Sequence, residues 1–287
     1  MTYSHYTSIN IFQIQMPGLR KLSWLSGKNS LIVIPQVLII KYLSKNNFDL
    51  SIAISWINMN IIIIGGTRGI GKEVALYFAQ DKGNKVLVTG RNENALKNLS
   101  SIYSNIYTFP LDLALFESKV GIFKDAVINH FKRVDILINM AGMLVVKDFI
   151  NISTNEARLM METNFFGPAS VIREIKPLMQ KGSHIVNISS MGGFQGSTKY
   201  KGLSYYSASK AALASLSECL AAEFTESGIS VNCLALGAVQ TEMLEEAFPG
   251  YKAPVDAIEM AGFISGFAMN GHKFINGKII PVAVNNP

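Results

Sequence analysis

The feature that most constrains this chain is an uncharged apolar run that leads directly into a glycine-rich segment. Residues 61–64 are four isoleucines, and residues 65–71 read Gly-Gly-Thr-Arg-Gly-Ile-Gly. Consecutive β-branched residues predict a strand covered on both faces, as in parallel sheets. The glycines predict a tight turn into a helix, whose first amides and dipole favour a pyrophosphate. Because a glycine-rich turn can also be purely structural, its position between strand and helix carries the nucleotide-binding interpretation.

The same alternation of short apolar runs and helical patterns continues along the rest of the chain. We expect further strands at 85–89, 106–109, 136–139, 184–189, 230–235 and 278–284, and helices between them, including 70–80 and 207–225. Alternating strands and helices predict βαβ units and a mostly parallel sheet. We therefore expect a single doubly wound α/β domain, a Rossmann fold, over residues 59–287, with a short substrate lid.

The first 58 residues differ in character from the rest. They contain five basic residues and one acidic residue, Asp49. Their longest apolar block, residues 31–40, is interrupted by Pro35 and is shorter than the roughly 20 residues of a membrane-spanning helix. We interpret this leader in one of two ways. Either translation begins at Met59 and the given start lies too far upstream, or these residues are an organelle transit peptide. The first interpretation predicts a cytoplasmic protein, and the second leaves organelle import open.

Charge and cysteine content argue against several kinds of partner. The net charge is +6, of which +4 lies in the leader, so the other 229 residues carry only +2. This leaves no basic face of the size that nucleic-acid binding needs, and we expect neither nucleic-acid nor membrane partners. Cys219 and Cys233 cannot build a disulfide framework and form no metal-ligand pattern with the four histidines. A reducing compartment and no metal are expected.

The end of the second predicted strand indicates which nucleotide is bound. Residues 89–92 read Thr-Gly-Arg-Asn, without the acidic residue that NAD-binding folds usually place there for the ribose 2′-hydroxyl. Arg91 and Arg68 can form a charge-assisted clamp on a 2′-phosphate. The sequence therefore predicts NADP, with NADPH preferred over NADH. The alternative is that both arginines are solvated surface charges.

A tyrosine and a lysine four residues apart carry the candidate chemistry. Tyr206 and Lys210 lie one turn apart on a predicted helix, Ser190 follows a predicted strand, and Asn164 lies in an earlier helical segment. A Y-x-x-x-K pair is common by chance. Together with the glycine motif, however, these residues resemble the short-chain dehydrogenase/reductase family of the smaller, single-domain type. The resemblance covers residues 59–284.

The resemblance implies roles for particular residues. The family's catalytic Asn, Ser, Tyr and Lys correspond to Asn164, Ser190, Tyr206 and Lys210. The implied cofactor-binding residues are Gly65, Thr67, Arg68, Gly69, Ile70, Gly71, Arg91, Asn92, Asp112, Leu113, Asn139, Ala141, Gly142, Tyr206, Lys210, Val239 and Thr241. Three positions depart from the family pattern: Ile64 stands where a threonine usually precedes the glycine motif, Met140 stands in an N-N-A-G motif, and Leu236 replaces the proline of a P-G pair.

The implied mechanism follows from the proton that carbonyl reduction requires. Tyr206 would act as general acid/base, Lys210 would stabilise its phenolate, Ser190 would hold the substrate oxygen, and Asn164 would position a water that links Lys210 to solvent. We expect an NADP-dependent oxidoreductase that interconverts a small-molecule carbonyl and an alcohol, and the family resemblance implies a homodimer or homotetramer. The alternative is a catalytically idle NADP-binding sensor or partner module on the same fold. A sugar epimerase of the longer related family is disfavoured by the glycine spacing.

Overall fold

The computed structural model describes residues 58–284, so the two interpretations of the leader lie outside the described residues. Its main element is a seven-stranded sheet with the order β3-β2-β1-β4-β5-β6-β9, in which every neighbouring pair is parallel. The strands are β1 (Asn60–Ile64), β2 (Lys85–Gly90), β3 (Ile106–Pro110), β4 (Val134–Asn139), β5 (Met179–Ser190), β6 (Ser230–Leu236) and β9 (Ile279–Val282). The order reverses between β1 and β4, which confirms the predicted doubly wound topology and places a crevice beyond their carboxyl ends.

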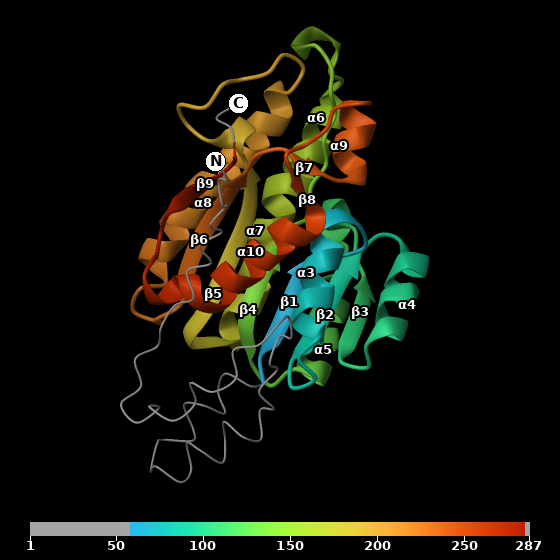
Figure 1. The fold of residues 1–287 in the computed structure, drawn as a ribbon. Helices are drawn as coiled ribbons and strands as arrows, with labels where there is room; N and C mark the ends of the chain where they lie inside the picture. The colour runs from blue at the N-terminus through green and yellow to red at the C-terminus, as the bar shows by residue number, and fades with distance from the viewer. Residues whose placement is uncertain (1–57, 285–287) are drawn as a thin grey trace, which may run out of the picture. The chain divides into compact units, whose positions relative to one another are not determined.

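Helices cover both faces of this sheet (Figure 1). They are α3 (Gly69–Ala79), α4 (Glu93–Ile102), α5 (Val120–His130), α6 (Thr154–Met161), α7 (Gly167–Ile175), α8 (Ser204–Glu223), α9 (Glu242–Ala247) and α10 (Ala257–Asn270). The predicted helix at 207–225 thus begins three residues earlier, at Ser204. No helix within residues 58–284 is both long and apolar enough to cross a bilayer.

Strand β1 shows why its four isoleucines are needed. Ile61 and Ile63 pack in a core with α3, α4 and α10 on one face of the sheet. Ile62 and Ile64 pack in a second core with α5 and α7 on the other face. All four side chains are at most 1% exposed. Successive side chains of a strand point to opposite faces of the sheet. In a strand between two helical layers every side chain is therefore buried, and apolar residues are favoured at each position.

Short elements connect the strands and helices at both ends of the sheet. They are the helical turns η1 (Leu113–Ser118), η2 (Phe149–Asn151), η4 (Lys176–Leu178), η5 (Met191–Gly193) and η6 (Gly271–Lys273), the π-helical turn η3 (Glu162–Phe166), and the paired strands β7 (Val239–Gln240) and β8 (Val255–Asp256). Figure 1 shows α6, α9 and the β7–β8 pair together above the carboxyl ends of the strands. The expected lid is thus short, since α9 has six residues.

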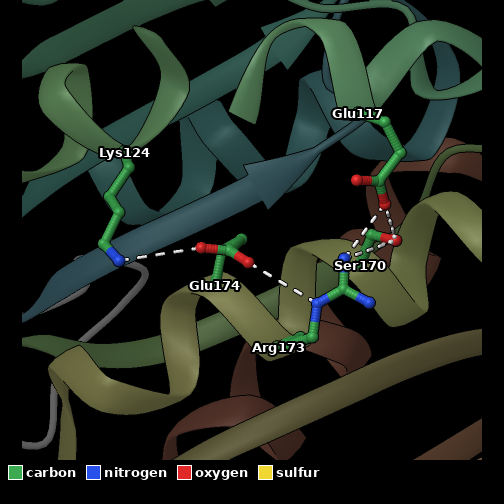
Figure 2. Close-up of polar contacts among 5 residues, drawn as sticks. All are labelled: Glu117, Lys124, Ser170, Arg173 and Glu174. Carbon is green, nitrogen blue, oxygen red and sulfur yellow. Dashed lines mark hydrogen bonds and ion pairs between the residues drawn. The ribbon is translucent and has the colours of Figure 1, made fainter. Parts of the chain in front are cut away.

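A chain of polar side chains on the surface connects α5, α7 and η1 (Figure 2). Lys124 Nζ lies 3.7 Å from Glu174 Oε2, and Arg173 Nε lies 3.5 Å from Glu174 Oε1. Arg173 Nη2 and Ser170 Oγ donate to Glu117 Oε1 at 3.0 and 2.8 Å. Each exposed pair contributes little alone. Together they hold η1, which begins beside the crevice, against α7.

Candidate active site

A cleft opens at the carboxyl ends of β1, β2 and β4, at the predicted crevice. Its lining residues are Ile64, Gly65, Thr67, Arg68, Gly69, Ile70, Gly71, Thr89, Gly90, Arg91, Leu111, Asp112, Leu113, Met140, Ala141, Gly142, Thr163, Ile188, Thr241, Glu242 and Met243. Most of the cofactor-binding residues expected from the sequence are therefore brought together, although they come from segments far apart in the chain. The cleft lies at the switch point of the sheet, where doubly wound folds bind their ligands.

The glycine loop is shaped by contacts that only glycine permits. Gly65 has φ +92°, and a Cβ there would lie 2.6 Å from Ala141 Cα. A Cβ on Gly71 would lie 2.0 Å from the carbonyl oxygen of Gly65. Helix α3 begins at Gly69, and the side chain of Arg68, the residue before it, turns to Glu246 instead of capping the helix. The first amides of α3 thus face the cleft as an anion-binding end.

Both predicted arginines line the cleft, but Arg68 already has a partner. Its Nη1 and Nη2 donate to Glu246 Oε1 and Oε2 at 2.5 and 3.1 Å. Arg91 is exposed and follows Gly90 at the end of β2. A Cβ on Gly90 would lie 2.4 Å from Thr67 Cγ2, so the position that carries a carboxylate in NAD-binding folds is closed here by Thr67.

The opposite wall of the cleft is held by η1. The Asp112 carboxylate accepts a hydrogen bond from Ala114 N at 3.0 Å and so caps η1. Leu113 packs against α7 so closely that a Cβ on Gly167 would lie 2.7 Å from Leu113 Cβ. Since Glu117 binds Ser170 on the same helix, both ends of η1 are tied to α7. Asp112 and Leu113 are thereby kept at the cleft.

Five expected cofactor-binding residues are not among those that line the cleft: Asn92, Asn139 and Val239, and also Tyr206 and Lys210, which lie next to it. The Asn92 side chain accepts from Ala95 N at 3.0 Å and caps α4. Asn139 is buried, and its Nδ2 donates to Asn187 Oδ1 at 2.7 Å, which joins β4 to β5. Val239 is buried in β7. Each of these last three residues has a role within the fold, as a cap, an inter-strand link and a packing contact.

Tyr206, Ser190 and Lys210 converge next to the cleft. Burial raises the pKa of Tyr206 above its ordinary value, and the hydrogen bond between the Tyr206 and Ser190 side chains offsets this only in part. Lys210 is 3% exposed and its Nζ donates to Ile188 O at 2.8 Å. Burial lowers the pKa of Lys210 to about 8, so its ammonium remains charged at neutral pH. Gly142, which lines the cleft, is a neighbour of this ammonium, since a Cβ there would lie 3.5 Å from Lys210 Nζ.

Asn164 ties this group together from the π-helical turn η3. Its Oδ1 accepts from Met143 N at 2.7 Å, and its Nδ2 donates to Met143 O and Ser209 Oγ, each at 2.9 Å. Ser209 Oγ in turn donates to Tyr206 O at 2.8 Å. Both amide hydrogens of Asn164 are therefore used within the protein. The side chain fixes the loop after β4 to the helix that carries Tyr206 and Lys210.

Sequence reasoning missed several residues that line the cleft. They include Thr89, Leu111, Met140, Thr163, Ile188, Glu242 and Met243. Thr163, Glu242 and Met243 are sequence neighbours of Asn164 and Thr241, and this adjacency is the signal that could have found them. The lining residues Ile188 and Leu111 are apolar and belong to or follow buried strands, so their residue types gave no signal.

The fold and the cleft define a nucleotide-binding α/β protein with a tyrosine–lysine pair at the cleft. Residues 59–252 match the family model for short chain dehydrogenases. The chain belongs to the short-chain dehydrogenase/reductase family, and it is an NAD(P)-dependent oxidoreductase that acts by hydride transfer. The predicted family and Rossmann fold are confirmed.

Individual relatives agree with this assignment. Dehydrogenase/reductase SDR family member 6 of Aquarana catesbeiana is 32% identical over 204 residues, which are 69% of this chain and 78% of that protein. A short chain dehydrogenase from Burkholderia cenocepacia in complex with NADP superposes with a TM-score of 0.68 at 21% identity, over 78% of this chain and 96% of that chain. A 4-hydroxyisoleucine dehydrogenase complexed with NADH superposes with a TM-score of 0.70 at 24% identity, over 79% of this chain and 97% of that chain. The two structures share the fold, and one holds NADP while the other holds NADH.

Proposed function

We propose that this enzyme is an NADP-dependent reductase or dehydrogenase that interconverts a small-molecule carbonyl and an alcohol, with Tyr206 as general acid/base. The observation that carries the proposal is that Lys210 Nζ lies beside Gly142 at the cleft, while Tyr206, one turn earlier on α8, interacts with Ser190. These groups come from β5, α8 and the loop after β4. A set of unrelated polar residues would have no reason to meet there.

The residues of the cleft fit a dinucleotide. The uncapped start of α3 suits a pyrophosphate, and the glycines at positions 65 and 71 let the loop fold tightly against Ala141 and against itself at the start of this helix. Arg68 and Arg91 would hold the 2′-phosphate, and Asp112 and Leu113 would contact the adenine. Thr241, which lines the cleft beside Gly69, would contact the nicotinamide carboxamide. When bound, this cofactor donates or accepts the hydride.

The side chains of the enzyme supply the proton chemistry. In the direction of reduction, Tyr206 gives its phenolic proton to the substrate oxygen as negative charge develops there. Burial raises the pKa of Tyr206, which disfavours the phenolate that this transfer leaves behind. The ammonium of Lys210, charged at neutral pH, stabilises that phenolate. Ser190, hydrogen-bonded to Tyr206, orients the substrate oxygen.

The preference for NADPH rests on charge. Arg68 and Arg91 line the same cleft, and the end of β2 carries Gly90 where a carboxylate would repel the phosphate. A charge-assisted hydrogen bond contributes roughly 1.5–3 kcal/mol, which corresponds to at least a tenfold change in affinity. Each arginine that contacts the 2′-phosphate should therefore favour NADPH by about that factor.

Calorimetric titration of the purified protein with NADPH and with NADH tests the cofactor proposal. We expect tighter binding of NADPH, and Arg91→Ala should weaken NADPH at least about tenfold while leaving NADH nearly unchanged. Arg133→Ala is the matched control, because Arg133 directly precedes the amino end of β4, whereas the cleft lies at the carboxyl ends of the strands. Equal affinities of the unmodified protein for both cofactors would refute the arginine clamp.

Consumption of NADPH with a panel of ketones and aldehydes tests the reaction. Turnover of at least one carbonyl compound, lost in Tyr206→Phe, is the expected result. A protein that binds NADPH but reduces no member of a broad panel would instead support the idle sensor module.

A further inference from the structure

The ion pair of Arg68 connects the cofactor loop to the lid. Arg68 precedes α3, whereas Glu246 lies 178 residues later on α9. Both oxygens of Glu246 accept from the guanidinium, at 2.5 and 3.1 Å. This hydrogen bond is also the main cause of the raised pKa of Arg68. In this arrangement, α9 is held against the loop that the cofactor phosphates would approach.

A second carboxylate of α9 lies on the same side. Glu242 lines the cleft, and a Cβ on Gly69 would lie 3.5 Å from its Oε2. The α9 helix thus presents Glu242 and Glu246 to a glycine loop whose helix end favours anions. Like charges repel at short range, so an incoming phosphate meets two carboxylates as well as the arginine.

The geometry limits how Arg68 can bind a phosphate. A guanidinium has two edges that can make paired hydrogen bonds, and Glu246 occupies the edge formed by Nη1 and Nη2. A 2′-phosphate has to displace Glu246 from this edge or share Arg68 with it. Either event weakens the binding of NADPH and leaves the binding of NADH, which has no such phosphate, unaffected.

We propose that Glu246 is a specificity-determining residue that competes with the cofactor 2′-phosphate for Arg68. Glu246 lowers the preference for NADPH that the arginines create, and exchange of the carboxylate for the phosphate releases α9 from the glycine loop. The inference rests on the proposed function, because Arg68 has to contact the 2′-phosphate for the exchange to occur.

The test is a set of calorimetric titrations with NADPH and with NADH. They compare the unmodified protein, Glu246→Gln, Arg68→Ala and the double variant. Glu246→Gln should raise the affinity for NADPH by about two- to fivefold, which is the size of effect expected for an exposed ion pair. It should change the affinity for NADH by less than about 1.5-fold. In the Arg68→Ala background the same substitution should have no effect on NADPH, because the competition acts through Arg68.

A charge-matched control separates this effect from a change in net charge. Glu226→Gln removes one exposed carboxylate between α8 and β6, at the end of the sheet away from the cleft. It should leave both affinities unchanged. If it tightens NADPH as much as Glu246→Gln does, the effect of Glu246 is a general one of charge and the competition is refuted.

The outcomes distinguish the two proposals. If Arg68→Ala weakens NADPH but Glu246→Gln leaves it unchanged, the arginine binds the phosphate without competition and this inference alone fails. If Arg68→Ala leaves the ratio of NADPH to NADH affinity unchanged, the arginine clamp of the proposed function fails, and the exchange fails with it. If Glu246→Gln still tightens NADPH binding in the Arg68→Ala background, the proposed competition is also refuted.

Discussion

Replacing Lys210 by methionine should stabilise the fold while it removes activity. The side chain is 3% exposed, and burial lowers its pKa from 10.5 to about 8. Because one pKa unit corresponds to about 1.4 kcal/mol, a charged ammonium at this position costs the fold about 3 kcal/mol at pH 7. Methionine also removes the hydrogen bond from Nζ to Ile188 O, a loss of about 1 kcal/mol. The net expectation is a gain of about 2 kcal/mol.

Thermal unfolding followed by circular dichroism at pH 7 measures this gain. For a domain of this size, about 2 kcal/mol raises Tm by about 4–8 °C. Lys97→Met is the matched control, because Lys97 is exposed on α4, where a substitution should change the free energy of unfolding by less than about 0.5 kcal/mol. Turnover of the Lys210→Met variant should fall at least about hundredfold, since the phenolate of Tyr206 loses its counter-charge.

The dependence on pH gives the sharper test. The lowered pKa means that unfolding takes up a proton between about pH 8 and 10.5, so the penalty is fully present below pH 8 and disappears as the pH rises through this window. The wild-type protein should therefore approach the stability of the methionine variant at pH 10. The reasoning is refuted if the Tm of Lys210→Met at pH 7 is equal to or below that of the wild type. It is also refuted if the difference in Tm between the two proteins is the same at pH 7 and at pH 10.

Three further predictions concern catalysis, the loop and assembly. Tyr206→Phe should lower turnover about hundredfold or more with NADPH affinity unchanged by calorimetry, and retained turnover would identify another acid, with Tyr205 the first to test. Gly71→Ala should abolish NADPH binding, because its Cβ would lie 2.0 Å from Gly65 O, and a normal titration would show that the loop can shift. We propose a homodimer or homotetramer paired through the helices that carry Asn164 and Tyr206, and light scattering that shows a monomer at micromolar concentration would contradict it.

Much of the fold could be predicted because its signals are local. The isoleucines of β1 predict a strand between two helical layers, and the two cores of the structure divide those side chains alternately. Tyr206 and Lys210 lie four residues apart, so a helix is enough to bring them to one face. The glycine loop was recognisable for a similar reason, since its shape depends on residues 65–71 and the strand before them.

The partners of several residues could not be predicted, because they depend on packing between distant segments. Asn92 lies beside Arg91 in the sequence, yet its side chain caps α4. Asn164 is predicted to position a water, and that role stays a prediction; what the sequence could not show is that both of its side-chain amide hydrogens bind protein atoms, in the loop after β4 and in α8.

The sequence by itself determined the class of fold, the nucleotide-binding loop and the candidate catalytic residues, because strand pattern, glycine spacing and helix period are properties of neighbouring residues. Only the tertiary structure decided how these pieces are used. It buries Lys210 deeply enough to lower its pKa to about 8, and it places Glu246 against Arg68 across 178 residues of chain. Burial and charge pairing arise when distant segments pack, and residue spacing along the chain does not encode either of them.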